Sequence, residues 1–402
     1  MSPSQPPARS RPSNQESRHP ARHVDTDERP FVLIWELTQA CELACKHCRA
    51  DAEPERHPDE LTTAEGKALL DSAAEFGDGQ LVVLSGGDPL ARDDVVSLVE
   101  YGTELGLRMT MTPSGTTSLT PDRIEALADA GLQRLALSLD GGSPEAHDEF
   151  RQEPGSFEQT MDAARSARDA GLPLQVNTTV CQETVDELPA LRDLTADLGA
   201  VLWSVFFLVP VGRGTVLDSI TPERAEAVMA WLAETQENVP FGIKTTEAPH
   251  YRRVVLQSER EKDEAKIKDQ PAEGDDSGTS AGKPVADGIG RRTGITAGNG
   301  FAFVSHTGEL FPSGFLPLSA GNVRDGGLVE KYRHADLFEQ LRNGDALEGK
   351  CGACPYRGVC GGSRSRAYAT TGNPLASDPL CAFVPEGYDG ALPPYWGELT
   401  NS

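Results

Sequence analysis

Seven of the eight cysteines in this 402-residue chain fall into two clusters. In a reducing compartment, clustered cysteines are metal ligands more often than disulfide partners. The first cluster has the spacing C-x3-C-x2-C and consists of Cys41, Cys45 and Cys48. Three thiolates can bind three irons of a four-iron cluster and leave the fourth iron open to a ligand. A zinc site is the alternative, but His47 stands between two of the cysteines, where its ring is poorly placed to complete it.

The second cluster has the spacing C-x2-C-x5-C-x20-C and consists of Cys351, Cys354, Cys360 and Cys381. Four cysteines that include one C-x2-C pair bind either zinc or an iron–sulfur cluster. The spacing alone does not choose between the two. The remaining cysteine, Cys181, lies in a predicted strand and is expected in the core, because a buried free cysteine behaves as a small apolar residue.

Six strand–helix units precede the second cluster and must position the first. Apolar runs predict strands at 31–37, 81–84, 108–112, 134–139, 174–180 and 202–209. Helices are predicted from Thr62 onward and at 93–105, 121–130, 156–170, 186–198 and 222–236. Such alternation predicts a parallel sheet, either open or closed into a partial barrel. In both forms ligands bind at the carboxyl ends of the strands, and the first cysteine cluster follows the first strand.

Composition divides the chain into four parts. Residues 1–29 are polar and predict a disordered tail, and residues 30–254 form the α/β domain. Residues 255–292 are charged and rich in Gly, Ser and Pro, which predicts a flexible acidic insertion. Residues 293–402 contain a predicted hairpin about Thr307-Gly308 and the second cysteine cluster. A metal centre would help to hold so short a domain together.

The formal net charge of −25 excludes binding to a phosphate backbone, which needs a basic surface. The sequence has no run of 18 apolar residues and no secretory signal, so we expect a cytoplasmic protein without a membrane span. The acidic excess favours a halophilic protein from a high-salt cytoplasm. An ordinary acidic soluble protein is the alternative.

The segment TQACELACKHCRA resembles the signature of radical S-adenosylmethionine (SAM) enzymes, and later motifs follow in that family's order to about residue 385. SGGDP at 85–89 resembles the family's GGEP motif, and LSLDG at 137–141 resembles its fourth-strand motif. The resemblance implies an α/β fold, a partial (βα)6 TIM-like barrel with a small C-terminal iron–sulfur domain. It also implies that the first cysteine cluster holds a [4Fe–4S] cluster, which cleaves SAM to a 5′-deoxyadenosyl radical. The residues then expected to bind SAM are Gly86, Gly87, Asp88, Ser138, Asp140, Arg151 and Asn177.

The second cysteine cluster resembles the auxiliary-cluster domain called SPASM or twitch, which implies a second [4Fe–4S] cluster. The full SPASM form carries two auxiliary clusters. Here Ser313 and Ser363 stand at positions that often supply the other one. We therefore predict one complete auxiliary cluster, and structural roles for the two serines.

Several stretches, among them LVPVGRG, APHYRR and CGACPYRGVCGGSRSRAYATTG, resemble the SAM-dependent haem synthases of the alternative haem pathway and their haem d1 relatives. The resemblance implies oxidative decarboxylation of two propionates of iron-coproporphyrin III to vinyl groups. It also implies a metalloporphyrin substrate and an electron donor such as ferredoxin or flavodoxin. A radical SAM maturase that modifies a peptide is the alternative, although residues 1–29 cannot form a winged-helix domain that binds a leader peptide.

A substrate with four carboxylates predicts a basic lining at the mouth of the barrel. The candidates for this lining are Arg213, His250, Arg252, Arg253, Arg364 and Arg366. His250, Tyr251 and His306 are candidates to approach the iron or a propionate.

Overall fold

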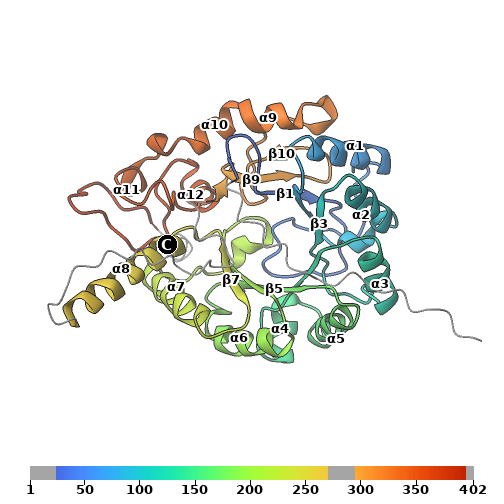
Figure 1. Ribbon diagram of the computed structural model, residues 1–402, viewed down its shortest axis with the longest axis horizontal. Coiled ribbons are helices and arrows are strands. Elements are labelled where there is room, and N and C mark those ends of the chain that lie inside the picture. The colour runs from blue at the N-terminus through green and yellow to red at the C-terminus, as the bar shows by residue number, and fades with distance from the viewer. Residues whose placement is uncertain (1–23, 270–294, 395–402) are drawn as a thin grey trace, which may run out of the picture.

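The computed structural model describes residues 24–269 and 295–394, in which ten strands form one curled sheet (Figure 1). The strand order is β10-β9-β1-β2-β3-β4-β5-β6-β7, with β8 beside β9, and β1 to β7 are parallel to their neighbours. The partial barrel that the family resemblance implied is confirmed. The strands are β1 (Val32–Glu36), β2 (Leu81–Ser85), β3 (Arg108–Met111), β4 (Arg134–Ser138), β5 (Leu174–Val180), β6 (Leu202–Phe207), β7 (Gly242–Thr246), β8 (Thr296–Ala297), β9 (Gly300–Val304) and β10 (Leu310–Phe311).

A ring of helices covers the outer face of the sheet, and α9 to α12 complete the ring between α1 and α8 (Figure 1). The helices are α1 (Thr63–Ala74), α2 (Val95–Glu104), α3 (Pro121–Asp129), α4 (Pro144–Arg151), α5 (Ser156–Asp169), α6 (Leu188–Asp197), α7 (Pro222–Gln236), α8 (Tyr251–Asp269), α9 (Leu328–His334), α10 (Asp336–Arg342), α11 (Gly349–Gly352) and α12 (Arg364–Thr371). Among these described helices, none is long and apolar enough to cross a membrane.

Successive side chains of each strand alternate between the helices and the interior of the barrel. In β5, Val176 and Val180 are buried in the main hydrophobic core, whereas Gln175, Asn177 and Thr179 line an internal cavity. The alternation therefore divides each strand into a face that stabilises the fold and a face that is available for chemistry.

Local signals placed the first helices correctly. Thr62 caps α1 and forms a capping box with Glu65, and Thr120 caps α3 ahead of Pro121. The sequence analysis missed several elements, among them the short helix α4, the strand β7 and the helices α8 to α12. The β7 sequence GIKTT is largely polar because β7 is the last strand of the sheet and three of its five residues line the cavity.

The C-terminal segment adds to the barrel sheet and does not form a wholly separate domain. Its strand β9 pairs in parallel with β1, and β9 and β10 form the predicted antiparallel hairpin about Thr307-Gly308. A small core of its own includes Leu316, Leu341 and Leu375. The segment is thus attached to the barrel at the β1 side of the sheet.

Two predicted segments, the N-terminal tail and the insertion, each have one boundary that differs in the structure. The tail does not extend to residue 29, because the Tyr332 hydroxyl donates to the Thr26 carbonyl at 2.7 Å and Arg342 contacts Asp27 at 3.3 Å. The insertion does not start at residue 255, because helix α8 continues to Asp269. The predictions for residues 1–23 and 270–292 lie outside the described residues.

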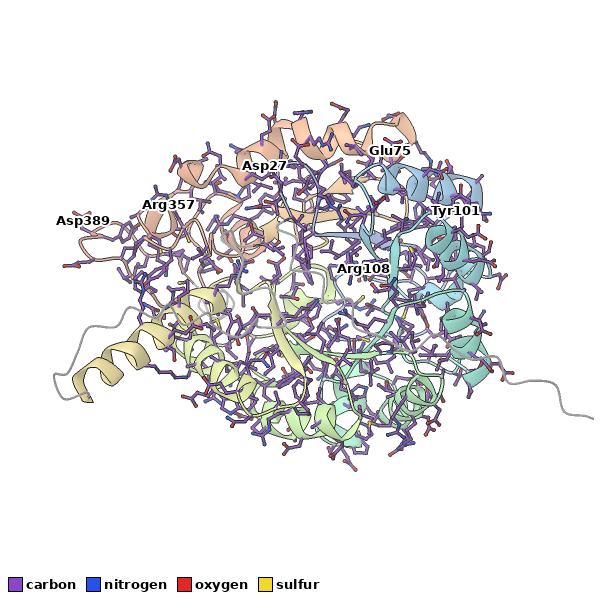
Figure 2. The ribbon with its side chains drawn as sticks, viewed as in Figure 1. Asp27, Glu75, Tyr101, Arg108, Arg357 and Asp389 are labelled. Carbon is purple, nitrogen blue, oxygen red and sulfur yellow. The ribbon has the colours of Figure 1, made fainter. Side chains whose placement is uncertain are left out.

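Charged side chains of both signs lie on the outer surface, among them the exposed cations Arg108 and Arg357 (Figure 2). Asp27, Glu75 and Asp389 are exposed there as well (Figure 2). Charged residues therefore face the solvent on this outer surface, as is usual for folded proteins.

Candidate active site

The loop that carries the first cysteine cluster follows β1 and is fixed by buried polar contacts. The carboxylate of Glu60 accepts hydrogen bonds from the Thr38 hydroxyl at 2.6 Å and from the Gln39 backbone at 2.9 Å. The guanidinium of Arg213 donates to three loop carbonyls, including that of Cys45 at 3.1 Å. These contacts hold the loop over the open end of the barrel.

Each of the three thiols accepts an N–H hydrogen bond. Cys41 accepts one from the Leu43 backbone at 3.4 Å, Cys48 accepts one from the Ala52 backbone at 3.5 Å, and Cys45 accepts one from the Arg151 guanidinium at 3.3 Å. Burial raises the pKa of Cys41, and its hydrogen bonds with the Ser114 hydroxyl and the Leu43 backbone oppose this rise. N–H donors around sulfur are what an iron–sulfur cluster requires of its surroundings.

The zinc alternative finds no support in the position of His47. Its ring stacks on Phe150 with centroids 4.7 Å apart, and its Nε2 lies 4.0 Å from the Asp140 carboxylate. Burial lowers the pKa of His47 to about 4, so the ring is neutral. Within residues 24–269 and 295–394, no three His, Cys, Asp or Glu side chains converge on a single metal ion. The thiolates of an iron–sulfur cluster need no such convergence, since each binds a separate iron.

A cavity of about 420 Å³ lies beneath the cysteine loop and runs through the barrel. The structure brings the three cysteines of the first cluster together with six of the seven residues predicted to bind SAM. The predicted residues that line this cavity are Cys41, Cys45, Cys48, Gly86, Gly87, Ser138, Asp140, Arg151 and Asn177. A cofactor bound in the cavity would therefore lie directly against the thiols.

Asp140 and Arg151 form a buried ion pair next to the cysteine loop. Arg151 Nε lies 3.1 Å from Asp140 Oδ2, and the other carboxylate oxygen of Asp140 accepts from the Thr179 backbone at 2.7 Å. Burial opposes ionisation of Asp140, but the Arg151 guanidinium holds its pKa below the usual value. Since Arg151 also donates to Cys45, the pair links the fourth strand of the barrel to the thiol cluster.

Gly86 and Gly87 lie where the loop after β2 touches the cysteine loop. A Cβ on Gly87 would lie 2.3 Å from the Ala40 carbonyl oxygen, and one on Gly86 would lie 2.6 Å from that of Thr38. The Gly87 backbone N–H donates to the Thr38 carbonyl at 2.8 Å. No side chain fits between the two loops, so the two glycines set the position of the cysteines.

Replacing Gly87 by alanine is expected to displace the cysteine loop and to lower the rate of SAM cleavage about a hundredfold. The measurement is the formation of 5′-deoxyadenosine by anaerobic protein with dithionite and SAM. The matched control is Gly344→Ala, since a Cβ there meets no atom within 4 Å. Equal rates in the two variants would contradict the tight fit at Gly87.

Asp88 is the one predicted SAM-binding residue that does not line the cavity. Its carboxylate accepts from the Leu90 backbone at 3.1 Å and from the Thr116 hydroxyl at 3.0 Å. Asp88 is buried, and burial raises its pKa. In the described structure its side chain caps the turn after β2, because it is held by these local donors.

The four cysteines of the second cluster line one small hollow beside α8 and α11. Cys351 accepts a hydrogen bond from the Asp378 backbone at 3.4 Å, and Cys360 accepts one from the Gly362 backbone at 3.4 Å. Burial raises the pKa of Cys360 well above its usual value and that of Cys381 to about 11. Arg253 and Lys350 border the same hollow, and their charges suit a cluster of thiolates.

Glu247, which follows β7, forms hydrogen bonds with the two serines that stand at the auxiliary-cluster positions, Ser313 and Ser363. Its carboxylate accepts hydrogen bonds from the hydroxyls of Ser313 at 3.1 Å and Ser365 at 2.9 Å, and also from Ser363. Glu247 has a φ of +55°, a conformation that few residues adopt. The structural roles predicted for Ser313 and Ser363 are confirmed by these contacts.

Most basic residues that the sequence suggested for substrate carboxylates serve the fold. Arg364 donates to the carbonyls of Pro374 and Ala376, and Arg253 pairs with Glu226. Arg213 donates to carbonyls of the cysteine loop. Arg366 and His250 lie in a buried network with Asp378. His306 pairs with Glu36. Of the candidates, Tyr251 and Arg252 line the cavity.

Sequence reasoning missed three other cations that line the cavity, namely Arg49, Arg134 and Lys244. Arg49 lies in the cysteine loop and pairs with Glu36 at 2.9 Å. Arg134 and Lys244 stand at inward-facing positions of β4 and β7. A basic residue at an inward position of an otherwise apolar strand was the available signal for Arg134.

The fold and the cysteine-capped cavity define a radical SAM enzyme. Residues 35–195 match the radical SAM superfamily, and the chain belongs to this superfamily. The superfamily implies a [4Fe–4S] cluster and SAM, and the three thiols with their N–H donors above an adjoining cavity fit both groups.

The chain is similar along most of its length to the "AdoMet-dependent heme synthase" of Methanosarcina barkeri (strain Fusaro / DSM 804). The two are 41% identical over 357 residues, which cover 89% of this chain and 97% of the relative. The "PqqA peptide cyclase" of Gluconobacter oxydans (strain 621H) is 31% identical over 359 residues, which cover 89% of this chain and 91% of that protein. The crystal structure of Streptococcus suis SuiB bound to S-adenosylmethionine shares the fold, with a TM-score of 0.64, 16% identity and coverage of 89% of this chain and 78% of that one.

Proposed function

We propose that this radical SAM enzyme makes haem from iron-coproporphyrin III by oxidative decarboxylation of two propionates. One observation carries the proposal: five cationic side chains but only two carboxylates line the cavity, in a protein with a net charge of −25. Both carboxylates are already engaged, Asp140 by Arg151 and Glu247 by serines. The cavity therefore suits a ligand with several carboxylates, and the similarity to the M. barkeri enzyme supports a tetrapyrrole.

When bound at Cys41, Cys45 and Cys48, the cluster supplies the electron that cleaves SAM and so makes hydrogen abstraction from the substrate feasible. Each propionate then loses one hydrogen atom, one electron and CO2, and it becomes a vinyl group. The electron needs an acceptor. The second cysteine cluster is a suitable place for one, so we infer that it holds a second [4Fe–4S] cluster.

The chain's own residues contribute position and charge. The contacts from Glu60 and Arg213 fix the cysteine loop, and the Asp140–Arg151 pair places a cation against Cys45. The apolar side chains Ile34, Val83 and Phe206 also line the cavity and suit the face of a macrocycle. The protein thereby binds and orients the substrate and excludes water from the reacting carbon.

Replacing Cys360 by alanine is expected to stop the formation of vinyl groups, which we assign to the auxiliary cluster, and to leave the cleavage of SAM by the first cluster intact. The iron content should fall from about eight to about four per chain, because the auxiliary cluster loses a ligand. Formation of 5′-deoxyadenosine should persist, whereas vinyl groups should no longer form. The measurements are iron analysis and product analysis of anaerobic protein. Zinc in the wild-type protein with only about four irons would contradict the auxiliary cluster.

The test of the proposed function is anaerobic incubation with iron-coproporphyrin III, SAM and dithionite. We expect a loss of mass from the porphyrin equal to two formic acid equivalents. An unchanged porphyrin, together with 5′-deoxyadenosine formation, would favour the second candidate, a peptide-modifying maturase. The 31% identity to the peptide cyclase of G. oxydans is the observation that supports this candidate.

We further infer that the enzyme works in the cytoplasm and receives electrons from a small donor such as ferredoxin or flavodoxin. The exposed acidic residues support a halophilic protein, since a strongly charged surface stays hydrated in high salt.

A further inference from the structure

Two cations inside the barrel have no carboxylate partner among the described residues. Lys244 lies on β7, where its register neighbour on β6 is the uncharged Ser204. Arg134 is the first residue of β4 and donates one hydrogen bond, to Gln175 at 3.2 Å. Both line the cavity. In this they differ from Arg49 and Arg151, which also line the cavity but pair with acidic residues.

Lys244 and Arg134 are half-buried, and burying an unpaired cation even in part is unfavourable, because the charged form loses some of its hydration. Burial, together with the nearby Arg134, lowers the pKa of Lys244 to about 8. Burial also lowers the pKa of Arg134. The fold keeps both charges in one cavity, in a chain with a large acidic excess, and an anionic ligand is the simplest way to compensate them.

Arg134 lies away from the cysteine loop, and Lys244 is the third of the five residues of β7. The loop follows the last residue of β1, whereas Arg134 begins β4, and these strands run in the same direction. The length of β4 alone separates the two ends of the barrel by about 13 Å. The cavity extends from the thiols to Arg134 and Lys244, so one elongated ligand can contact the cysteine loop and these two cations at the same time.

We propose that Lys244 and Arg134 bind the substrate carboxylates that the reaction leaves in place. This inference rests on the proposed function, in which two of four propionates react. The reacting propionates must lie near the SAM site beneath the cysteine loop. The retained propionates then point toward the part of the cavity wall that Arg134 and Lys244 form, and the two cations can donate charge-assisted hydrogen bonds to them.

Binding of two iron porphyrins to the full, cluster-loaded chain under anaerobic conditions tests this inference. Iron-protoporphyrin IX carries only the retained carboxylates, and its dimethyl ester carries none. Lys244→Met is expected to raise the Kd for iron-protoporphyrin IX about tenfold, the loss of one charge-assisted hydrogen bond. The Kd for the ester should not change. Titration of the Soret absorption measures both.

Two variants serve as controls. Lys244→Arg keeps the charge and should retain most of the affinity. Lys262→Met removes a lysine on the outside of α8, where it pairs with Glu237, and should leave both Kd values unchanged. Without ligand, Lys244→Met should unfold at a temperature no lower than the wild type, because it removes an unpaired cation from the interior.

The pH dependence gives an independent check. Lys244 binds a carboxylate only when protonated, so the wild-type Kd for iron-protoporphyrin IX should rise as the pH increases through about 8. Arg134, the charged group that perturbs Lys244, stays protonated in this range, and Ser204 does not titrate. Lys244→Arg should remove the rise.

An unchanged Kd for iron-protoporphyrin IX in Lys244→Met would overturn this inference and leave the proposed function intact. Equal weakening for the dimethyl ester would also overturn it, because the effect would then not concern carboxylates. A wild-type chain that binds neither iron-protoporphyrin IX nor iron-coproporphyrin III would contradict both the inference and the proposed function.

Discussion

Replacing Cys45 by alanine is expected to abolish the formation of 5′-deoxyadenosine from SAM and dithionite. Cys45 is the central thiol of the first cluster, and its sulfur accepts a hydrogen bond from Arg151 at 3.3 Å. Without it, two thiolates remain for a cluster that needs three, and a buried guanidinium faces the gap. Iron analysis of the same protein should show about four irons instead of about eight.

Cys181→Ala is the matched control for this variant. Cys181 is equally buried but belongs to neither cluster, and it packs against Phe150, Leu208 and Leu217. Its loss should leave both the iron content and SAM cleavage near the wild-type values. Undiminished 5′-deoxyadenosine formation in Cys45→Ala would refute the assignment of the first cluster as the SAM-cleaving centre.

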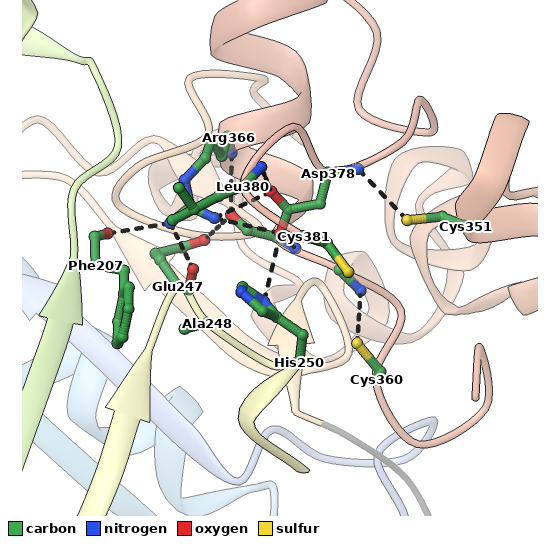
Figure 3. A network of polar contacts seen from close by, with 12 residues as sticks. Phe207, Glu247, Ala248, His250, Cys351, Cys360, Arg366, Asp378, Leu380 and Cys381 are labelled. Atoms are coloured by element: carbon green, nitrogen blue, oxygen red, sulfur yellow. Dashed lines mark hydrogen bonds and ion pairs between the residues drawn. The ribbon is translucent and has the colours of Figure 1, made fainter. Parts of the chain in front are cut away.

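Replacing Arg366 by methionine is expected to lower the free energy of unfolding by about 3–5 kcal/mol, the usual effect of breaking a buried ion pair. Arg366 on α12 is 1% exposed and lies at the centre of the network in Figure 3. Its guanidinium donates to the Phe207, Leu208 and Glu247 carbonyls and pairs with Asp378 at 3.1 Å. The variant would leave Asp378 charged, buried and without this partner.

The loss should be large because Arg366 joins two distant parts of the sheet. The C-terminal segment pairs with β1 through β9, and Arg366 attaches it to the ends of β6 and β7. Urea unfolding measures the change. The control is Arg357→Met, since Arg357 is exposed and its ion pair with Asp345 should contribute less than about 1 kcal/mol. Similar midpoints for the two variants would show that the network does not hold the barrel closed.

The sequence predicted well those features that depend on neighbours along the chain. The capping box of Thr62 and the N-cap Thr120 lie within one helical turn of the groups that they bind. The cysteine spacings and the apolar strands are also local patterns. Helix α4 and strand β7 escaped the same reasoning because α4 is short and GIKTT lacks an apolar run.

The environment of each charged side chain could not be predicted in this way. Arg253, Arg364 and Arg366 looked like substrate ligands in the sequence, yet partners brought near them by the fold hold all three inside the protein. Asp88 does not line the cavity, and its carboxylate accepts a hydrogen bond from Thr116, which lies 28 residues away.

The sequence by itself thus determined the class of chemistry, because closely spaced cysteines and successive strand-end motifs are encoded locally. Only the tertiary structure decided which cations face the cavity. Whether a cation is paired depends on side chains from other strands, as with Arg134 on β4 and Lys244 on β7, which share one cavity despite their distance along the chain. Neither cation has a carboxylate partner among the described residues. This depends on how residues far apart in the sequence pack together, and no local sequence pattern can predict it.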